Sequence, residues 1–155
     1  MCKGFFSGET PLTKAKLIIS TPNGIKERDI TFLIDTGAAK TALGIVDVIR
    51  LNLGVDLLRE LRKIEIEGVS GRTNILTLKK PFLLRFEDES TVLNRRSIHF
   101  ELLDELWILP KSTVSVLGRD ILNRFEITYK ANEDKIIMRR DDFAEGCHIC
   151  YSERI

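Results

Sequence analysis

The chain has 155 residues, of which 43% are hydrophobic and 30% charged, with a net charge of +1. This length suits one domain that buries a core without staples. The near-zero charge argues against nucleic acid as a partner, and no apolar run reaches the ~18 residues of a membrane span. The start of the chain lacks a signal-like apolar segment, and three cysteines form no disulfide framework, so we expect a cytoplasmic protein.

The first predicted elements form a hairpin. Residues 14–20 and 25–34 are rich in apolar side chains and read as strands. Between them lies Asn23-Gly24, a dipeptide typical of tight hairpin turns because both residues tolerate positive φ. The second strand of this hairpin ends directly at Asp35.

After Asp35 the sequence predicts short helices and then a second hairpin. Between residues 41 and 63 the apolar side chains recur at helix-like intervals, which predicts two short helices with Gly54 as the break. Residues 64–67 alternate apolar and polar side chains, and an extended pattern resumes at residues 74–78. A glycine-containing turn separates these two strands.

The second half of the chain predicts further short strands. We expect them at residues 82–86, 96–103, 114–117, 125–129 and 135–139, with a polar turn at 87–90 and a short helix at 119–124. Many short strands with few helices indicate a mostly β sandwich or barrel. We divide the chain into an N-terminal segment (1–13), one domain (14–140) and a loosely ordered C-terminal tail (141–155).

The sequence Asp35-Thr36-Gly37 has the make-up of a catalytic turn. An apolar strand fixes the carboxylate, while Gly37 lets the backbone turn sharply and directs an N–H toward that carboxylate. Thr36 contributes a hydroxyl for a structural hydrogen bond. The tripeptide also begins many ordinary turns, so an unrelated β domain stays open on this motif alone.

Two further segments accompany this motif. With F-L-I-D-T-G-A-A-K-T-A-L at 32–43, E-G-V-S-G at 67–71 and S-V-L-G-R-D-I-L-N-R-F at 115–125, the chain resembles the retropepsin-like aspartic proteases. The resemblance covers about residues 14–140. It implies a mostly β, closed, barrel-like single lobe with one or two short helices, assembled as a symmetric homodimer.

The resemblance also implies an aspartic endopeptidase with Asp35 as its catalytic carboxylate and Thr36, Gly37 and Ala38 as its active-site loop. Two carboxylates must share one proton, so that one accepts a proton from the attacking water while the other donates to the scissile carbonyl. The chain has no second Asp-Thr-Gly or Asp-Ser-Gly. We therefore expect Asp35 of a second copy as the partner, with Thr36 locking the two loops across the two-fold axis. This chemistry needs no cofactor.

The hairpin near residues 66–75 is expected to act as a flap over an extended peptide or protein substrate. Its tip would be formed by Gly68, Val69, Ser70 and Gly71. The side chains of Ile34, Ala42, Val116 and Leu117 are candidates for pocket lining, with plain core favoured.

Gly118 and Arg119 are expected beside the active-site loop. Many retroviral members have an acidic residue where this chain has Ala39, and that acid pairs with the arginine after the second glycine. Arg119 is therefore left to pair with Asp120, with an acid of the second copy, or with nothing.

Two alternatives remain open. The same fold can serve as a catalytically weak or inactive dimeric module that binds peptides or acts as a scaffold. Cys147 and Cys150 form a C-x-x-C, but a structural zinc ion needs four ligands, so Cys2 or a second copy would have to complete the site. Unpaired thiols are favoured and no metal site is predicted. His99 is expected to be structural.

Overall fold

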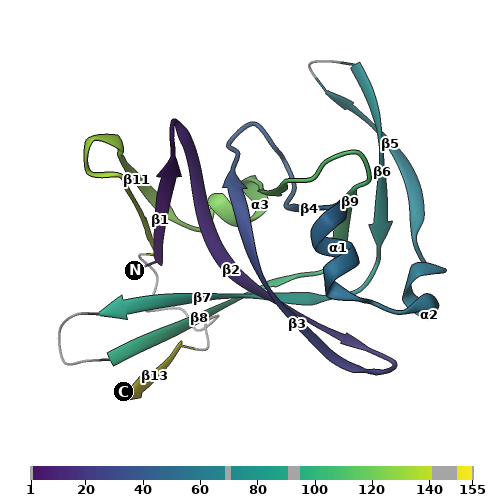
Figure 1. The fold of residues 1–155 in the computed structure, drawn as a ribbon, viewed down its shortest axis with the longest axis horizontal. Helices are drawn as coiled ribbons and strands as arrows, with labels where there is room; N and C mark the ends of the chain where they lie inside the picture. Colours follow the sequence, from purple (N-terminus) through teal and green to yellow (C-terminus); the bar gives the residue numbers. More distant parts are fainter. Residues whose placement is uncertain (1, 69–70, 91–94, 141–149, 155) are drawn as a thin grey trace.

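A computed structural model of the chain describes residues 2–68, 71–90, 95–140 and 150–154 (Figure 1). The fold is mostly β, as predicted. The strands are β1 (Cys2–Ser7), β2 (Thr10–Thr21), β3 (Gly24–Ile34), β4 (Ala42–Gly44), β5 (Arg62–Gly68), β6 (Gly71–Leu78), β7 (Phe82–Ser90), β8 (Arg95–Leu103), β9 (Leu106–Leu109), β10 (Ser115–Leu117), β11 (Glu126–Lys130), β12 (Lys135–Arg139) and β13 (Cys150–Arg154).

The helices are short. In the described ranges they are α1 (Ile45–Leu51), α2 (Val55–Leu58), α3 (Arg119–Leu122) and the 3-10 turn η1 (Ala131–Glu133). The helices α1 and α2 confirm the helical spacing read between residues 41 and 63, and three α-helices replace the one or two implied by the resemblance. Among the described residues, none of the helices combines the length and the apolar character of a membrane span.

The strands pair in one branched sheet. Its main path is β11-β12-β1-β2-β3-β10-β4-β9-β6-β5, and β7 joins β2 to β8, which also pairs with β13. Among the described residues the two ends of this path are not joined, so the expected closure into a barrel is not observed. Most neighbours are antiparallel, but β3 runs parallel to β10 and β4 runs parallel to β9. Parallel neighbours place their carboxyl ends at the same edge of a sheet.

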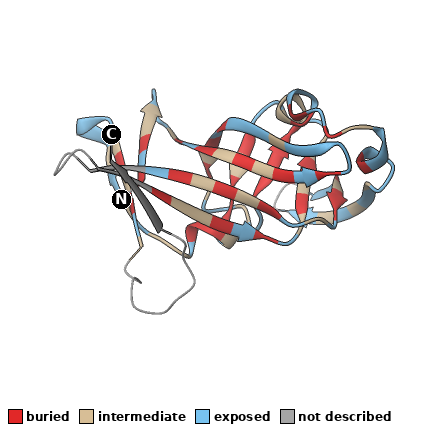
Figure 2. Cartoon of the chain, turned by 90° about the horizontal axis from the view of Figure 1, so that it is seen from below, coloured by how far each residue is buried: buried red, intermediate tan, exposed pale blue. Residues whose placement is uncertain are grey.

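Alternation along the strands builds the core. In β2, Ala15, Leu17 and Ile19 are at most 4% exposed, whereas Lys14 is exposed and Lys16 half-buried. Figure 2 shows the same banding of buried and exposed positions along several strands. Side chains of a strand point alternately to opposite faces, so one face of β2 enters the core. Each fully buried aliphatic side chain contributes about 1.5–3 kcal/mol.

Two predicted turn glycines, and one asparagine that was not predicted, have positive φ angles. Gly24 has φ +112° at the tip of the β2–β3 hairpin, and Gly54 has φ +88° between α1 and α2. Asn52, at φ +52°, ends α1 in the left-handed region, and its N–H donates to the carbonyl oxygen of Ile49 at 3.2 Å. These conformations suit glycine and asparagine.

Several expectations about the remaining segments are wrong. Residues 87–90 continue β7 and pair with residues 95–98 of β8, where a polar turn was expected. Residues 87–90 contain no glycine or proline that would end the strand. Their pairing with β8 therefore outweighs the turn signal of their polar side chains. The strands β1, β4 and β9 were not predicted. Within the tail expected to be loosely ordered, residues 150–154 form β13 and pair with β8, and residues 141–149 and 155 lie outside the described residues. The proposed domain boundaries stay a prediction.

A buried carboxylate ties β8 to two later segments. The side chain of Glu101 is only 5% exposed. Its Oε2 accepts a hydrogen bond from Nη1 of Arg124 at 2.8 Å, and its Oε1 lies 2.8 Å from Nε2 of His99 and also accepts from Nη1 of Arg140. The His99 ring packs edge-on against Phe125, so this histidine is structural, as expected.

We predict that Glu101→Ala lowers the free energy of unfolding by about 3 kcal/mol, because it leaves two guanidinium groups without their shared buried counter-charge. Urea unfolding followed by circular dichroism measures this loss. The matched control is Glu126→Ala on the exposed side of β11, which should change stability by less than about 0.5 kcal/mol. Equal effects of the two substitutions would contradict a structural role for the Glu101 cluster.

Candidate active site

The parallel pairing of β3 and β10 brings the two predicted site segments together. Ile34 pairs with Leu117, so Asp35 and Gly118 leave adjacent strands at the same edge of the sheet. The N–H of Asp35 donates to the carbonyl oxygen of Leu117 at 3.1 Å. The aspartate motif and the second glycine motif therefore meet, as the resemblance implies.

The Asp35 carboxylate is held by its own loop. The N–H of Gly37 donates to Oδ1 of Asp35 at 2.9 Å, and the N–H of Ala38 donates to the Asp35 carbonyl oxygen at 3.2 Å. A Cβ added at Gly37 would lie 3.1 Å from that Oδ1, which is tight. The second oxygen, Oδ2, accepts no hydrogen bond from the described part of the chain. Asp35 is half-buried, so its carboxylate is oriented but still accessible.

Arg119 is bonded to the backbone of the same loop. Its Nη1 donates to the carbonyl oxygens of Thr36 at 3.1 Å and Gly37 at 3.4 Å, and its N–H donates to the Ala38 carbonyl oxygen at 2.8 Å. These carbonyl oxygens are the partners that the sequence left undecided, and Asp120 is not among them. The Thr36 side chain is exposed, and its hydroxyl has no partner in the described ranges.

Hydrogen bonds between Thr41 and Asp120, which the sequence did not predict, form a junction that holds the end of the loop. Thr41 is buried and donates its N–H to both carboxylate oxygens of Asp120, at 2.9 and 3.0 Å. Its hydroxyl donates to Oδ1 of Asp120 at 2.7 Å and accepts from the N–H of Gly118 at 3.1 Å. The N–H of Ile121 donates to the same Oδ1 at 2.9 Å. In the sequence, Thr41 directly precedes an apolar segment. This pattern does not identify Asp120 as its hydrogen-bond partner.

A glycine is required at position 118 because the backbone of Lys40 lies close to it, and not because of an unusual backbone angle. A Cβ at this position would lie 2.4 Å from the carbonyl carbon and 2.6 Å from the carbonyl oxygen of Lys40. Real side chains do not tolerate such contacts with backbone atoms. The second glycine therefore lets the end of the active-site loop pack directly on the start of α3.

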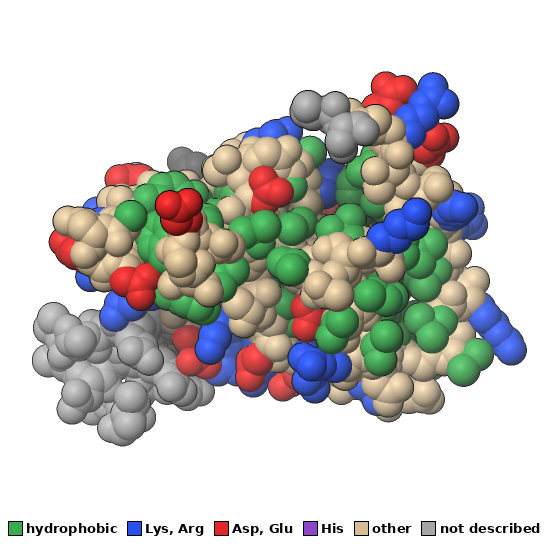
Figure 3. Space-filling model, turned by 45° about the horizontal axis from the view of Figure 1, so that its top comes forward, with side chains coloured by type: hydrophobic (Ala, Val, Ile, Leu, Met, Phe, Trp, Pro, Cys, Tyr) green, Lys and Arg blue, Asp and Glu red, His purple; other side chains and the backbone are tan. Residues whose placement is uncertain are grey.

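The predicted flap segment is a hairpin of β5 and β6. Gly68 pairs with Gly71, and Gly71 has φ +111°, whereas Val69 and Ser70 lie outside the described residues. This hairpin extends away from the rest of the sheet (Figure 1). Figure 3 shows charged side chains gathered at its far end, where Arg72 contacts Glu67 at 3.3 Å. Ile64 and Ile66 are half-buried on the alternate positions of β5, so one face of the hairpin is apolar.

The candidate pocket residues divide by burial. Ile34, Ala42 and Leu117 are at most 4% exposed and pack in the core, while Val116 is half-buried. In the part of the chain that the structure describes, no group of three or more His, Cys, Asp and Glu side chains is placed to hold a metal. Cys147 lies outside the described residues, so the C-x-x-C question stays open.

We predict that Thr41→Val lowers the free energy of unfolding by about 1–3 kcal/mol, because the buried Gly118 N–H loses its acceptor while the shape of the side chain is kept. Chemical denaturation measures this change. Thr128→Val, at an exposed position of β11, is the matched control and should be nearly neutral. An equally small effect at Thr41 would show that the junction does not stabilise the loop.

Comparisons with known proteins give a similarity in fold and no family assignment. No family model matches the chain, and no curated protein matches it. One similar solved structure is described as a retropepsin-like aspartic protease from Rickettsia conorii. It is 16% identical, with a TM-score of 0.42, over 81% of this chain and 88% of that chain. At these values the similarity does not establish the family or the activity of this chain.

Proposed function

We propose that the protein is an aspartic endopeptidase whose active site combines Asp35 of two identical chains. The observation that carries this proposal is the half-buried Asp35 carboxylate in an Asp-Thr-Gly turn, fixed through one oxygen by the Gly37 N–H at 2.9 Å. The other oxygen is left for a water molecule or a second carboxylate. A carboxylate that is oriented and accessible suits general acid–base work.

The second carboxylate would come from a second copy. The neighbouring acid, Asp120, already accepts from the N–H groups of Thr41 and Ile121 and from the Thr41 hydroxyl, so it is committed to the loop. A two-fold axis near the loop would place Asp35 against its own copy. The exposed Thr36 hydroxyl would then find its partner in the facing loop.

The hydrolysis would follow from this pairing. The ionised Asp35 takes a proton from water, and the protonated Asp35 of the other copy hydrogen-bonds the scissile carbonyl oxygen. Water attacks the carbonyl carbon, and the pair delivers a proton to the leaving amine as the C–N bond breaks. The β5–β6 hairpin would close over an extended peptide or protein segment and exclude bulk water.

We predict that Asp35→Asn lowers the rate of peptide-library cleavage at least about 1,000-fold, because an amide cannot accept the proton of the attacking water. Cleavage products are identified by mass spectrometry, with and without a statine-type transition-state mimic. Asp56→Asn, at an exposed position of α2, is the matched control and should leave cleavage unchanged. Equal cleavage by Asp35→Asn and wild type would remove the protease proposal, and peptide binding without any cleavage would favour the binding or scaffold module.

We predict that the Asp35→Asn chain inhibits the wild-type chain when the two are mixed and allowed to exchange. Random assortment with an equal amount of variant leaves about half of the wild-type dimers, and a fivefold excess leaves about one sixth. Cleavage rate and sedimentation are followed on the same samples, with the Asp56→Asn chain as the mixing control. Unchanged activity in a fivefold excess of exchanged variant would show that one chain acts alone.

A further inference from the structure

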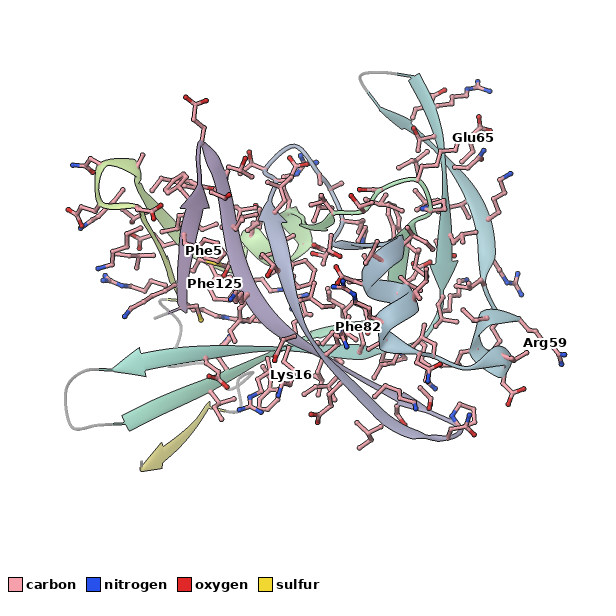
Figure 4. The ribbon with its side chains drawn as sticks, in the orientation of Figure 1. Phe5, Lys16, Arg59, Glu65, Phe82 and Phe125 are labelled. Atoms are coloured by element: carbon pink, nitrogen blue, oxygen red, sulfur yellow. The ribbon has the colours of Figure 1, made fainter. Side chains whose placement is uncertain are left out.

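A cavity whose lining contains no residue of the active-site loop is lined mainly by basic side chains. It has a volume of about 510 Å³, and its lining comes from β1, β2, β3 and β7. The pairing register explains the arrangement, because Lys16 of β2 lies opposite Asp29 of β3 and opposite Arg85 of β7. Paired residues of antiparallel strands share one face, and Lys14, two residues before Lys16, lies on that face too. Figure 4 labels Lys16 where β2 passes β7.

The charges of this cavity are unbalanced. Four basic side chains (Lys3, Lys14, Lys16 and Arg85) and two acidic ones (Asp29 and Glu87) line it, which gives four minus two, a net charge of +2. The whole chain has a net charge of only +1. The remaining residues therefore have a net charge of −1, and the positive balance of the chain lies at the cavity.

The basic groups have few partners of their own. Arg85 is paired with Glu87 at 3.0 Å, but in the described part of the chain the three lysines have no ion pair. The ammonium of Lys14 lies 5.8 Å from the centroid of the Phe5 ring, which leaves its donors unfilled. Like charges gathered in one cavity repel, so a multivalent anion that reaches them is favoured.

Arg85 adds hydrogen-bond donors of fixed direction to the positive charge of this cavity. Its guanidinium has five N–H donors, yet within the described residues it makes one hydrogen bond, from Nη2 to Oε1 of Glu87. Its Nε is buried and has no hydrogen-bond partner among the residues that the structure describes. The Arg85 side chain is 24% exposed and belongs to the lining of the cavity. A planar guanidinium beside several ammonium groups suits an oxyanion with several acceptor oxygens.

We propose that this cavity is a binding site for a compact phosphoryl anion carrying at least two negative charges. The lysines supply the point charges and Arg85 supplies directed N–H donors to the phosphoryl oxygens. The volume lies within the range of small-ligand sites. No residue of the Asp35 loop lines this cavity, so the site stands whether or not the chain is a protease.

The test is a calorimetric titration of inorganic pyrophosphate into the full chain. We expect saturable binding of one pyrophosphate per chain, with a Kd on the order of 10–500 μM at low salt and weaker binding as sodium chloride is raised. Lys16→Gln and Lys14→Gln should each weaken binding roughly fivefold or more. Lys26→Gln, on β3 outside this lining, is the matched control and should leave the Kd unchanged. Circular dichroism establishes that each variant is folded.

The outcomes separate the site from general charge effects. No saturable binding of pyrophosphate by the wild-type chain would overturn the proposal, and so would an equal loss of affinity in Lys26→Gln and Lys16→Gln. A parallel titration with citrate distinguishes the source of the negative charge. Citrate binding as tight as pyrophosphate would overturn the phosphoryl assignment, whereas weaker citrate binding supports it.

Discussion

The candidate site depends on one buried junction, in which Thr41 links the Asp120 carboxylate to the Gly118 N–H. The loop after β3 must return to the sheet as β4, on the other side of β10. Backbone N–H groups in this buried place need acceptors, because an unpaired buried donor costs free energy. The Asp120 carboxylate accepts from two backbone N–H groups and one hydroxyl. With Lys40 packed against Gly118, the loop that carries Asp35 is held at both of its ends.

The structure brings the Asp35 and Gly118 segments together, as the sequence predicted, because the local signals of both segments are strong. Asp35 and Gly118 each follow an apolar strand, and Asn23-Gly24 and Gly54 take their expected places. The junction could not be predicted, since Thr41 and Asp120 are separated by 79 positions and no local pattern joins them. The strands β4 and β9 are too short to show a period of two. The antiparallel pairing of residues 87–90 with β8 outweighs the turn signal of their polar composition.

Three carboxylates of this fold differ in the donors that bind them. Glu101 is buried and shares its charge with two arginines, and Asp120 is satisfied by N–H and O–H donors of the neighbouring backbone and side chain. In the described part of the chain, the Asp35 carboxylate accepts a single hydrogen bond, from the N–H of Gly37 in its own loop. A carboxylate already saturated with donors has little capacity left for a reacting group, so Asp120 is a poor second member of a catalytic pair. Asp35 keeps the capacity that acid–base chemistry needs.

The proposed two-fold symmetry would explain why one short loop has so many restraining contacts. In a two-fold assembly each residue near the axis meets its own copy, so a displacement of the loop occurs on both sides at once. Acid–base catalysis tolerates errors in position poorly, because reacting atoms must lie about 3–3.5 Å apart. The carbonyl contacts of Arg119, the close packing at Gly118 and the Thr41–Asp120 junction restrain one loop within one chain. In the proposed dimer these same contacts would set the separation of the two carboxylates, so half of the site would be positioned before the halves meet.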